Sequence, residues 1–209
     1  MQFLVIEGNI GAGKTTLSRM VASEFNAKLV LEQFADNPFL PKFYEDQERY
    51  SFPLELSFLA DRYKQIKKEI LNLDLFYSFL VSDYYFSKTA IFAQNTLQGD
   101  EYHLFRQIFD MVSESMPRPD MYVYLHADVS RLLDNISKRG RDYERHITAE
   151  YLKKIENGYF SFLKQNHSFP ILIIDINNID FVQKPDDYQL LKSAIFDQEY
   201  KSGINRLIL

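Results

Sequence analysis

The sequence contains no cysteine. Disulfide bonds, thiol catalysis and thiolate metal sites are therefore excluded, and a reducing compartment is compatible with this composition. The chain also lacks an apolar run of the roughly 18–20 residues that a membrane helix needs. A strand pattern starts at Phe3 and a glycine-rich loop follows it, which leaves no room for a signal peptide. We expect a cytoplasmic protein without a membrane partner.

An excess of positive charge is also missing. The sequence has 24 Lys and Arg residues against 29 Asp and Glu residues, so the formal net charge is −5. Because proteins that bind nucleic acids are more often basic, a nucleic-acid polymer is disfavoured as a partner. Hydrophobic residues make up 46% of the 209 residues, enough for one sizeable α/β core. We expect a single domain over residues 1–209, without repeats or a dividing linker.

The clearest motif lies between residues 8 and 16. Gly8, Gly13, Lys14 and Thr15 match G-x-x-x-x-G-K-[ST], the pattern of a phosphate-binding loop. Glycines let several backbone N–H groups point at one anion, the lysine adds positive charge, and the threonine hydroxyl is a ligand type for Mg²⁺. The candidate ATP-binding residues of this loop are Gly8, Asn9, Ile10, Gly11, Ala12, Gly13, Lys14, Thr15 and Thr16.

The segments on both sides of the loop fit this motif. Residues 3–6 form an apolar run typical of a buried strand, and Leu17, Val21 and Phe25 recur at helical spacing. A helix that begins at the loop directs the positive end of its dipole at the phosphates. The alternative is a glycine-rich turn that matches by chance. The motif predicts binding of a nucleoside triphosphate but does not identify the group that receives the phosphate.

Further apolar runs alternate with helical spacing along the chain. We predict strands at 3–6, 28–31, 79–83, 121–126 and 171–175, a first helix directly after the glycine-rich loop, and further helices at 52–72, 84–97, 100–115, 129–139, 148–166 and 186–198. This alternation predicts an α/β protein with the P-loop NTPase fold, in which a five-stranded parallel sheet is flanked by helices. No role is assigned to residues 200–209.

Two acidic residues follow predicted strands. Because ligands of parallel sheets lie at the carboxyl ends of the strands, Glu32 and Asp83 are expected near the loop. Glu32 is placed to accept a proton from an attacking hydroxyl group; the alternative is a solvated acid at a strand end. Asp83 resembles a Walker-B acid that binds Mg²⁺ together with Thr15; the alternative is an N-cap for the next helix.

A charged segment follows the helix that is expected to end at residue 139. Arg139 and Arg141 flank Gly140 in a predicted short lid over residues 138–146. Guanidinium groups in such a lid stabilise the charge of a transferring phosphoryl group. The alternative is an ordinary solvated run of charges.

Together these features resemble the deoxyribonucleoside kinases of the thymidine, deoxycytidine and deoxyguanosine kinase type, including bacterial deoxyadenosine kinases. The resemblance covers about residues 1–199, and its most specific part is Arg139-Gly140-Arg141-Asp142-Tyr143-Glu144 with Tyr151-Leu152. It implies that Glu32 activates the 5′-hydroxyl group and that Lys14, Arg139 and Arg141 neutralise phosphate charge. It also implies that Tyr44 and Glu144 hold the 3′-hydroxyl group, and that Asp180 and Phe181 surround the adenine of ATP.

The chain departs from the family pattern after the third strand. The family usually has an acid followed by Arg and Ser there, whereas this chain has Asp83-Tyr84-Tyr85. Because Tyr84 replaces the arginine, we expect the lid arginines to carry more of the phosphate charge.

A second departure concerns the position that reads the base. The family has Gln there and this chain has Glu55, with Arg62 two helical turns away on the same face. Pyrimidine-preferring relatives engage this arginine with an acid, but the matching position here is Thr89. Arg62 is therefore expected to be free to donate to a purine N7, beside an ionised Glu55 that accepts from the adenine amino group. The alternative is that Glu55 and Arg62 pair with other side chains.

The predicted reaction is ATP-dependent phosphorylation of the 5′-hydroxyl group of a purine deoxynucleoside, in nucleotide salvage. Deoxyadenosine is favoured, and deoxyguanosine is second because Glu55 can instead accept from guanine N1–H and N2–H. The candidate substrate-binding residues are Glu32, Tyr44, Glu55, Arg62, Asp83 and Glu144. The family implies ATP and Mg²⁺ and makes a homodimer the expected state.

Two rival functions are open at this point. A nucleoside monophosphate kinase of the thymidylate kinase type shares the fold, but it needs extra cations for the phosphate of its acceptor. The chain has Glu32, Tyr44 and Glu55 there, which suit a neutral nucleoside better. A P-loop regulatory protein with little turnover is the other rival, and it predicts no acceptor pocket.

Overall fold

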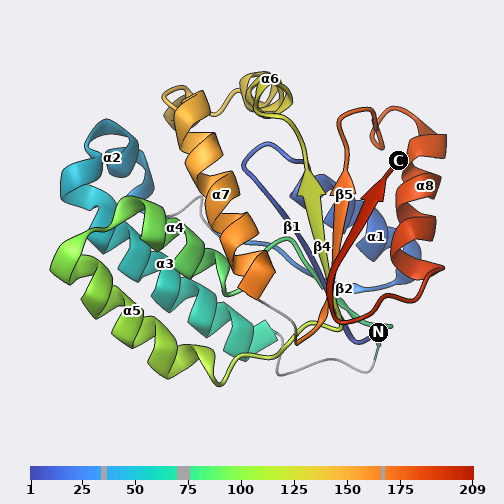
Figure 1. Ribbon diagram of the computed structural model, residues 1–209, viewed down its shortest axis with the longest axis horizontal. Coiled ribbons are helices and arrows are strands. Elements are labelled where there is room, and N and C mark those ends of the chain that lie inside the picture. Colours follow the sequence, from blue (N-terminus) through green and yellow to red (C-terminus); the bar gives the residue numbers. More distant parts are fainter. Residues whose placement is uncertain (34–36, 70–75, 166–167) are drawn as a thin grey trace.

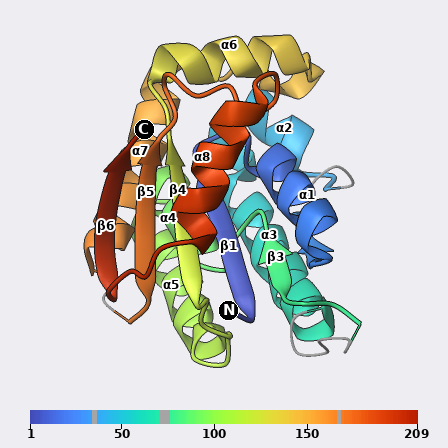
Figure 2. The same cartoon turned by 90° about the vertical axis from the view of Figure 1, so that its right-hand side faces the viewer.

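The computed structural model describes residues 1–33, 37–69, 76–165 and 168–209. Its strands form one parallel sheet in the order β2-β3-β1-β4-β5-β6 (Figures 1 and 2). They are β1 (Phe3–Gly8), β2 (Lys28–Val30), β3 (Leu80–Ser82), β4 (Met121–His126), β5 (Pro170–Asp175) and β6 (Gly203–Ile208). The predicted α/β fold with a helix-flanked parallel sheet is confirmed.

The prediction of five strands was wrong, because the tail adds β6 at the edge of the sheet. This strand pairs with β5 in parallel, with Ile204 opposite Ile171. Polar Asn205 and Arg206 interrupt its apolar residues, and Ile208 is 87% exposed. An edge strand with solvent on one side does not need the continuous apolar run that marks the central strands.

Helices cover both faces of the sheet. Figure 1 shows α3, α4, α5 and α7 on one side and α1 and α8 on the other, while α6 lies beyond the carboxyl end of β4. The helices are α1 (Lys14–Phe25), α2 (Leu40–Glu45), α3 (Gln47–Glu69), α4 (Lys88–Thr96), α5 (Gly99–Ser113), α6 (Val129–Arg139), α7 (Ala149–Gln165) and α8 (Pro185–Phe196), with a 3-10 turn η1 (Asp142–Glu144).

Some helix boundaries differ from the sequence prediction. The structure has α2 and the start of α3 in the region between residues 40 and 52, for which no helix was predicted. The predicted end of the next helix, near residue 72, lies outside the described residues. The helix expected to begin at residue 84 begins at Lys88 instead. No helix in the described part of the chain is long and apolar enough to cross a membrane.

Successive side chains of a strand point to opposite faces of the sheet, so each strand contributes residues to the core on both faces. In β1, Leu4 and Ile6 pack with α1 and α8, whereas Phe3 and Val5 pack with the helices of the opposite face. Both faces of β4 and β5 are apolar in the same way, because helices cover them on both sides. Parallel strands place their carboxyl ends at one edge, so the residues after β1, β2 and β3 meet there.

The packing of α8 gives a test of the core. Leu191 is fully buried, whereas the neighbouring Leu190 is 49% exposed. We expect Leu191→Ala to lower the free energy of unfolding by about 2–5 kcal/mol, because it leaves a cavity in the core. The matched control Leu190→Ala is expected to change it by less than about 0.5 kcal/mol. Urea denaturation measures both values, and equal losses would contradict this packing.

Candidate active site

The phosphate loop joins β1 to α1 and depends on two glycines. Gly13 has φ +85°, and a Cβ atom there would lie 2.9 Å from the ring of Phe181. A Cβ atom on Gly8 would lie 2.6 Å from the carbonyl oxygen of Leu125 in β4. Larger side chains at either position would push the loop away from its neighbours, so the close approach of backbone requires glycine.

Two asparagines fix the loop to the helices above it. The Asn9 amide donates to the carbonyl oxygen of Leu152 in α7 at 2.8 Å, and its own oxygen accepts from the Ile10 N–H at 2.8 Å. Asn135 of α6 donates to the carbonyl oxygen of Gly11 at 2.9 Å. The loop is therefore preorganised by contacts from both helices that flank the lid.

Lys14 extends from the start of α1 back over the loop. Its Nζ donates to the carbonyl oxygen of Asn9 at 2.9 Å. Burial and repulsion from Lys88 lower the pKa of Lys14 to about 8, despite opposing attraction from Glu7, Asp83 and Glu32. A cation in this position is stabilised by any anion that enters the loop.

Asp83 connects the second strand to the loop. One carboxylate oxygen accepts from the backbone N–H of Glu32 at 2.8 Å, and the other accepts from the hydroxyl group of Thr15. These hard oxygen ligands fit Mg²⁺, which commonly takes one or two protein ligands and completes its shell with phosphates and waters. Within the described residues, no cluster of His, Cys, Asp and Glu could hold a metal ion by itself.

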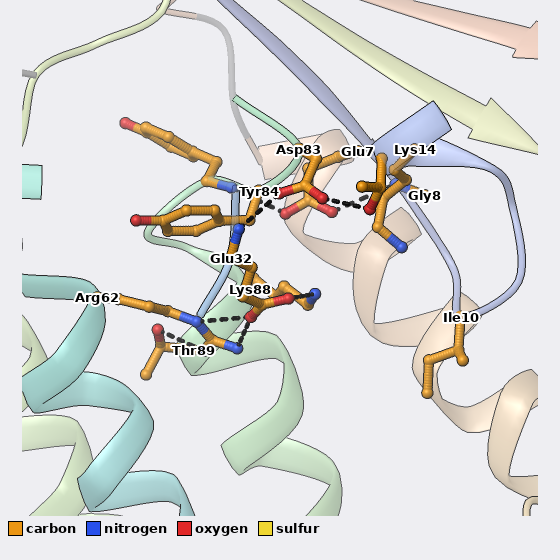
Figure 3. Close-up of polar contacts among 12 residues, drawn as sticks. Glu7, Gly8, Ile10, Lys14, Glu32, Arg62, Asp83, Tyr84, Lys88 and Thr89 are labelled. Carbon is orange, nitrogen blue, oxygen red and sulfur yellow. Dashed lines mark hydrogen bonds and ion pairs between the residues drawn. The ribbon is translucent and has the colours of Figure 1, made fainter. Parts of the chain in front are cut away.

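Glu32 lies at the centre of a buried charge cluster (Figure 3). Its Oε1 accepts from Nε of Arg62 at 3.0 Å and from Nη2 at 2.5 Å, and its Oε2 accepts from Nζ of Lys88 at 2.5 Å. Burial alone would raise the pKa of this carboxyl group, but Lys88 and Arg62 outweigh it and lower the pKa to about 2. Glu32 is therefore ionised at neutral pH.

Arg62 does not match the expectation that it would be free. Its Nε and Nη2 bind Glu32, and its Nη1 donates to the hydroxyl group of Thr89 at 2.8 Å. Thr89 thus contacts the arginine, because a threonine hydroxyl group can accept a hydrogen bond from a guanidinium group. Arg62 therefore fits the alternative that the sequence left open, in which it pairs with other side chains.

Glu55 also differs from the expectation that it would be ionised. Burial is the main cause that raises the pKa of its carboxyl group to about 7, against attraction from Arg62 and Lys88 and a hydrogen bond from Thr96. Its Oε1 accepts from the Thr96 hydroxyl group at 2.9 Å, and its buried Oε2 has no partner within the described residues. Near neutral pH this side chain is thus present in both protonation states.

The lid arginines converge on one carboxylate. Arg139, at the end of α6, donates to Oε2 of Glu144 through Nε at 3.0 Å and through Nη2 at 2.5 Å. Arg141 donates to Oε1 of Glu144 at 3.2 Å. The ring of Tyr143 stacks on Tyr44 of α2, with centroids 6.1 Å apart. The lid therefore contacts α2 and brings both guanidinium groups to the rim of the sheet.

Two cavities meet at this rim. The first, with about 790 Å³ of free space that includes open solvent, contains the residues expected to bind the acceptor: Glu32, Tyr44, Glu55, Arg62, Asp83 and Glu144. The second contains loop residues Gly11, Ala12, Gly13, Lys14, Thr15 and Thr16 together with Asp180 and Phe181. Lys14, Thr15, Arg139 and Arg141 line both cavities. Of the remaining candidates, Gly8 and Asn9 are buried at the base of the loop, and Ile10 faces the first cavity.

The segment after β5 forms the outer wall of the second cavity. Phe181 is buried with its ring against Gly13, and the N–H of Asp180 donates to Asp187 of α8 at 2.6 Å. Arg131 of α6 donates to the carbonyl oxygens of Ile176 and Ile179. Tertiary contacts thus fix this segment beside the phosphate loop.

Sequence analysis missed several residues of the site. Lys88 contacts Glu32, and Glu7 accepts from the Tyr85 N–H and the Tyr159 hydroxyl group, both at 2.9 Å. Each is a charged residue within or beside an apolar run, which is a usable signal because a buried charge needs a partner. Of the aromatic residues that line the first cavity, Phe43, Phe58 and Phe92 were missed, and Tyr143 and Tyr151 were quoted for the family motif without a role in the site.

Comparisons with known proteins agree with this geometry. A family model described as deoxynucleoside kinase matches residues 4–199. The deoxyguanosine kinase of Bacillus subtilis (strain 168) is 33% identical over 197 residues, which cover 92% of this chain and 95% of that protein. The deoxyadenosine kinase of Dictyostelium discoideum is 30% identical over 207 residues, which cover 97% of this chain and 82% of that protein.

Solved structures show the same fold. The deoxyadenosine kinase from M. mycoides, with the products dCMP and a flexible dCDP bound, has a TM-score of 0.82 and 24% sequence identity, over 94% of this chain and all of that chain. The same kinase with bound dATP has a TM-score of 0.80 and covers 92% of this chain and 98% of that chain. The resemblance seen in the motifs is confirmed, and the chain belongs to the deoxynucleoside kinase family of transferases.

Proposed function

We propose that this protein transfers the γ-phosphoryl group of ATP to the 5′-hydroxyl group of a purine deoxynucleoside in nucleotide salvage, with deoxyadenosine favoured and deoxyguanosine second. The observation that supports it best is the meeting of two cavities at Lys14, Thr15, Arg139 and Arg141. One cavity lies on the phosphate loop and the other on the Glu32 carboxylate. A donor in the cavity on the phosphate loop and an acceptor in the cavity on Glu32 would have their reacting ends at the shared residues.

The proposed step is an in-line displacement. The 5′ oxygen forms a bond to the γ-phosphorus, the bond from the γ-phosphorus to the β–γ bridging oxygen breaks, and ADP leaves. The hydroxyl proton passes to the Glu32 carboxylate. A carboxylate whose pKa lies near 2 is a weak base. In the loose transition state of phosphoryl transfer, however, the proton needs to leave the hydroxyl group only late in the step. Glu32 therefore both orients the hydroxyl group and takes up its proton as the bond to phosphorus forms.

The remaining charges fit the same step. Lys14, Arg139 and Arg141 would neutralise the phosphate oxygens. Thr15 and Asp83 would hold Mg²⁺, which supplies charge neutralisation at the β- and γ-phosphates when it is bound. The expectations of a homodimer and of a cytoplasmic location stay predictions.

Glu55 is the basis of the proposed purine preference. As a neutral acid it can accept from the N6 amino group of adenine and donate to N7, so it also performs the task first assigned to Arg62. Guanine presents two acceptors, O6 and N7, on the same edge and would leave one unpaired, which costs binding in a buried site. An ionised Glu55 matches guanine instead, because the N1–H and N2–H groups are both donors.

The decisive experiment measures ADP release with ATP and Mg²⁺ against each of the four deoxynucleosides and each of their monophosphates. We expect turnover with deoxyadenosine and, more slowly, with deoxyguanosine. Turnover with monophosphates alone would identify a nucleoside monophosphate kinase. Binding of ATP without turnover on any acceptor would favour the regulatory protein.

The role of Glu32 predicts a selective loss of turnover. We expect Glu32→Gln to lower kcat by roughly 10²–10⁴, the usual contribution of a general base, with the Kd of ATP little changed. Steady-state kinetics and ATP titration measure the two quantities, and thermal melting shows whether the variant is folded. Glu45→Gln, which alters an exposed acid on α2, is the control. A near-normal kcat in a folded Glu32→Gln enzyme would remove this residue from the role.

The protonation of Glu55 predicts a base preference that depends on pH. Because its pKa is near 7, the neutral form dominates at pH 6 and the ionised form at pH 8. We expect the kcat/KM ratio of deoxyadenosine to deoxyguanosine to fall by about a hundredfold between these pH values, because the neutral fraction falls about tenfold while the ionised fraction, which matches guanine, rises about tenfold. Glu55→Gln, which cannot ionise, is expected to give a flat ratio.

The control for this pH dependence is Glu48→Gln, which alters an exposed acid on the same helix and should keep the pH dependence of the natural chain. A ratio that is independent of pH in the natural chain, or a pH dependence that survives in Glu55→Gln, would refute the assignment of base reading to Glu55.

A further inference from the structure

Lys88 is a buried cation that the proposed reaction has not yet used. It is the first residue of α4, it lines the acceptor cavity, and its side chain is 9% exposed. Its Nζ lies 2.5 Å from Oε2 of Glu32 and 5.5 Å from the centre of the Phe92 ring. An ammonium group is strongly hydrated in water, so its burial here requires anionic partners.

Tyr84, where the family pattern has an arginine, supplies no cation to the site. Tyr84 is 1% exposed, and its hydroxyl group donates to Oε1 of Gln65 in α3 at 2.8 Å. This side chain brings no charge to the rim. The lid arginines, which were expected to compensate, bind Glu144 in this structure. Lys88 instead places an ammonium group directly against the carboxylate that would orient the acceptor hydroxyl group (Figure 3).

The two oxygens of Glu32 are held in different ways. Arg62 binds Oε1 through two nitrogens and is itself anchored to Thr89, so this side is rigid. Oε2 is held by the end of the flexible lysine chain through one contact. An incoming 5′-hydroxyl group needs one carboxylate oxygen as its acceptor. Breaking the single contact of Oε2 with Lys88 therefore costs less free energy than breaking the two contacts of Oε1 with Arg62.

Lys88 also faces the positive charge of the phosphate loop. Among the charged neighbours of Lys14, Lys88 has the largest effect on the pKa of Lys14, and it lowers this pKa. Two ammonium groups that repel each other in a buried site mark a place where an anion is stabilised between them. Glu32 neutralises only part of this positive charge, because it also binds Arg62. The transferring phosphoryl group is an anion that would pass between Glu32 and the loop.

We propose that Lys88 is a catalytic cation that leaves Oε2 of Glu32 when the 5′-hydroxyl group binds there and then contacts the transferring phosphoryl group. This inference rests on the proposed function. The lysine keeps its proton throughout, and the hydroxyl proton goes to Glu32. The exchange couples the arrival of the acceptor to the delivery of positive charge, so the phosphoryl group meets this cation when a nucleoside is in place.

The test compares Lys88→Met and Lys88→Arg with the natural chain and with Lys64→Met, which alters an exposed lysine on α3. We expect Lys88→Met to lower kcat by about 10²–10³, the usual effect of losing one donor to a transition-state anion, and Lys88→Arg to retain part of kcat. The Kd of ATP should change by less than about threefold, while the affinity for ADP, aluminium fluoride and deoxyadenosine together should fall in parallel with kcat/KM.

A pattern in which Lys88→Met raises the KM of deoxyadenosine but keeps kcat would overturn the proposal, because the lysine would then contribute only to substrate binding. A Lys88→Met enzyme that behaves like Lys64→Met would overturn it as well. If the natural chain itself releases no ADP with any nucleoside, the proposed function fails, and this is distinguishable because it precedes any comparison between variants.

A second measurement does not depend on the stability of Lys88→Met. In Lys88→Ala, added ethylammonium ion should restore kcat in a saturable way, whereas tetramethylammonium ion at the same ionic strength should not, because it has no N–H group to donate. Rescue that is equal for both ions, or absent in a folded Lys88→Ala enzyme, would contradict a direct contact between the ammonium group and the phosphoryl group.

Discussion

The ion pairs of Glu32 with Arg62 and Lys88 are the interaction on which the site depends. A single buried carboxylate without partners would cost several kcal/mol and would take up a proton. Two cations instead keep it ionised, with a pKa of about 2. Its backbone N–H is bound by Asp83, which also accepts from Thr15 of the phosphate loop. The second strand, the third strand and the loop are thus connected through one chain of polar contacts.

The parallel sheet makes this connection possible. The order β2-β3-β1 places β3 between the strand before Glu32 and the strand before the phosphate loop. Asp83, directly after β3, therefore lies between the two and contacts both sides. Because helices cover both faces of the sheet, the carboxyl edge is where these polar groups meet cavities instead of core. A deoxynucleoside kinase needs this closeness, because the acceptor hydroxyl group must reach the terminal phosphate of the donor.

Burial has opposite effects on two acids of the acceptor cavity. Glu32 is buried beside two cations and stays ionised, whereas Glu55 has one hydrogen bond from Thr96 and a pKa raised to about 7. The difference follows from partners, because desolvation acts on both carboxyl groups in the same direction. An ionised acid and a partly neutral acid are suited to different tasks, the first to orienting a hydroxyl group and the second to hydrogen bonding with a heterocycle.

The phosphate loop, the α/β alternation, the acids after β2 and β3 and the arginines 139 and 141 could be predicted from the amino-acid sequence, because local spacing and apolar runs encode these features. The strand β6 was missed, because an edge strand needs no continuous apolar run. The sequence also predicted that Arg62 would be free and that Glu55 would be ionised, and both side chains differ from this in the structure. The three-dimensional contacts were needed to see that Arg62 and Lys88, from two different helices, share one carboxylate, and that one oxygen of Glu55 has no partner among the residues that the structure describes. Pairing and burial of charges depend on contacts between residues far apart in the chain, and no local pattern records them.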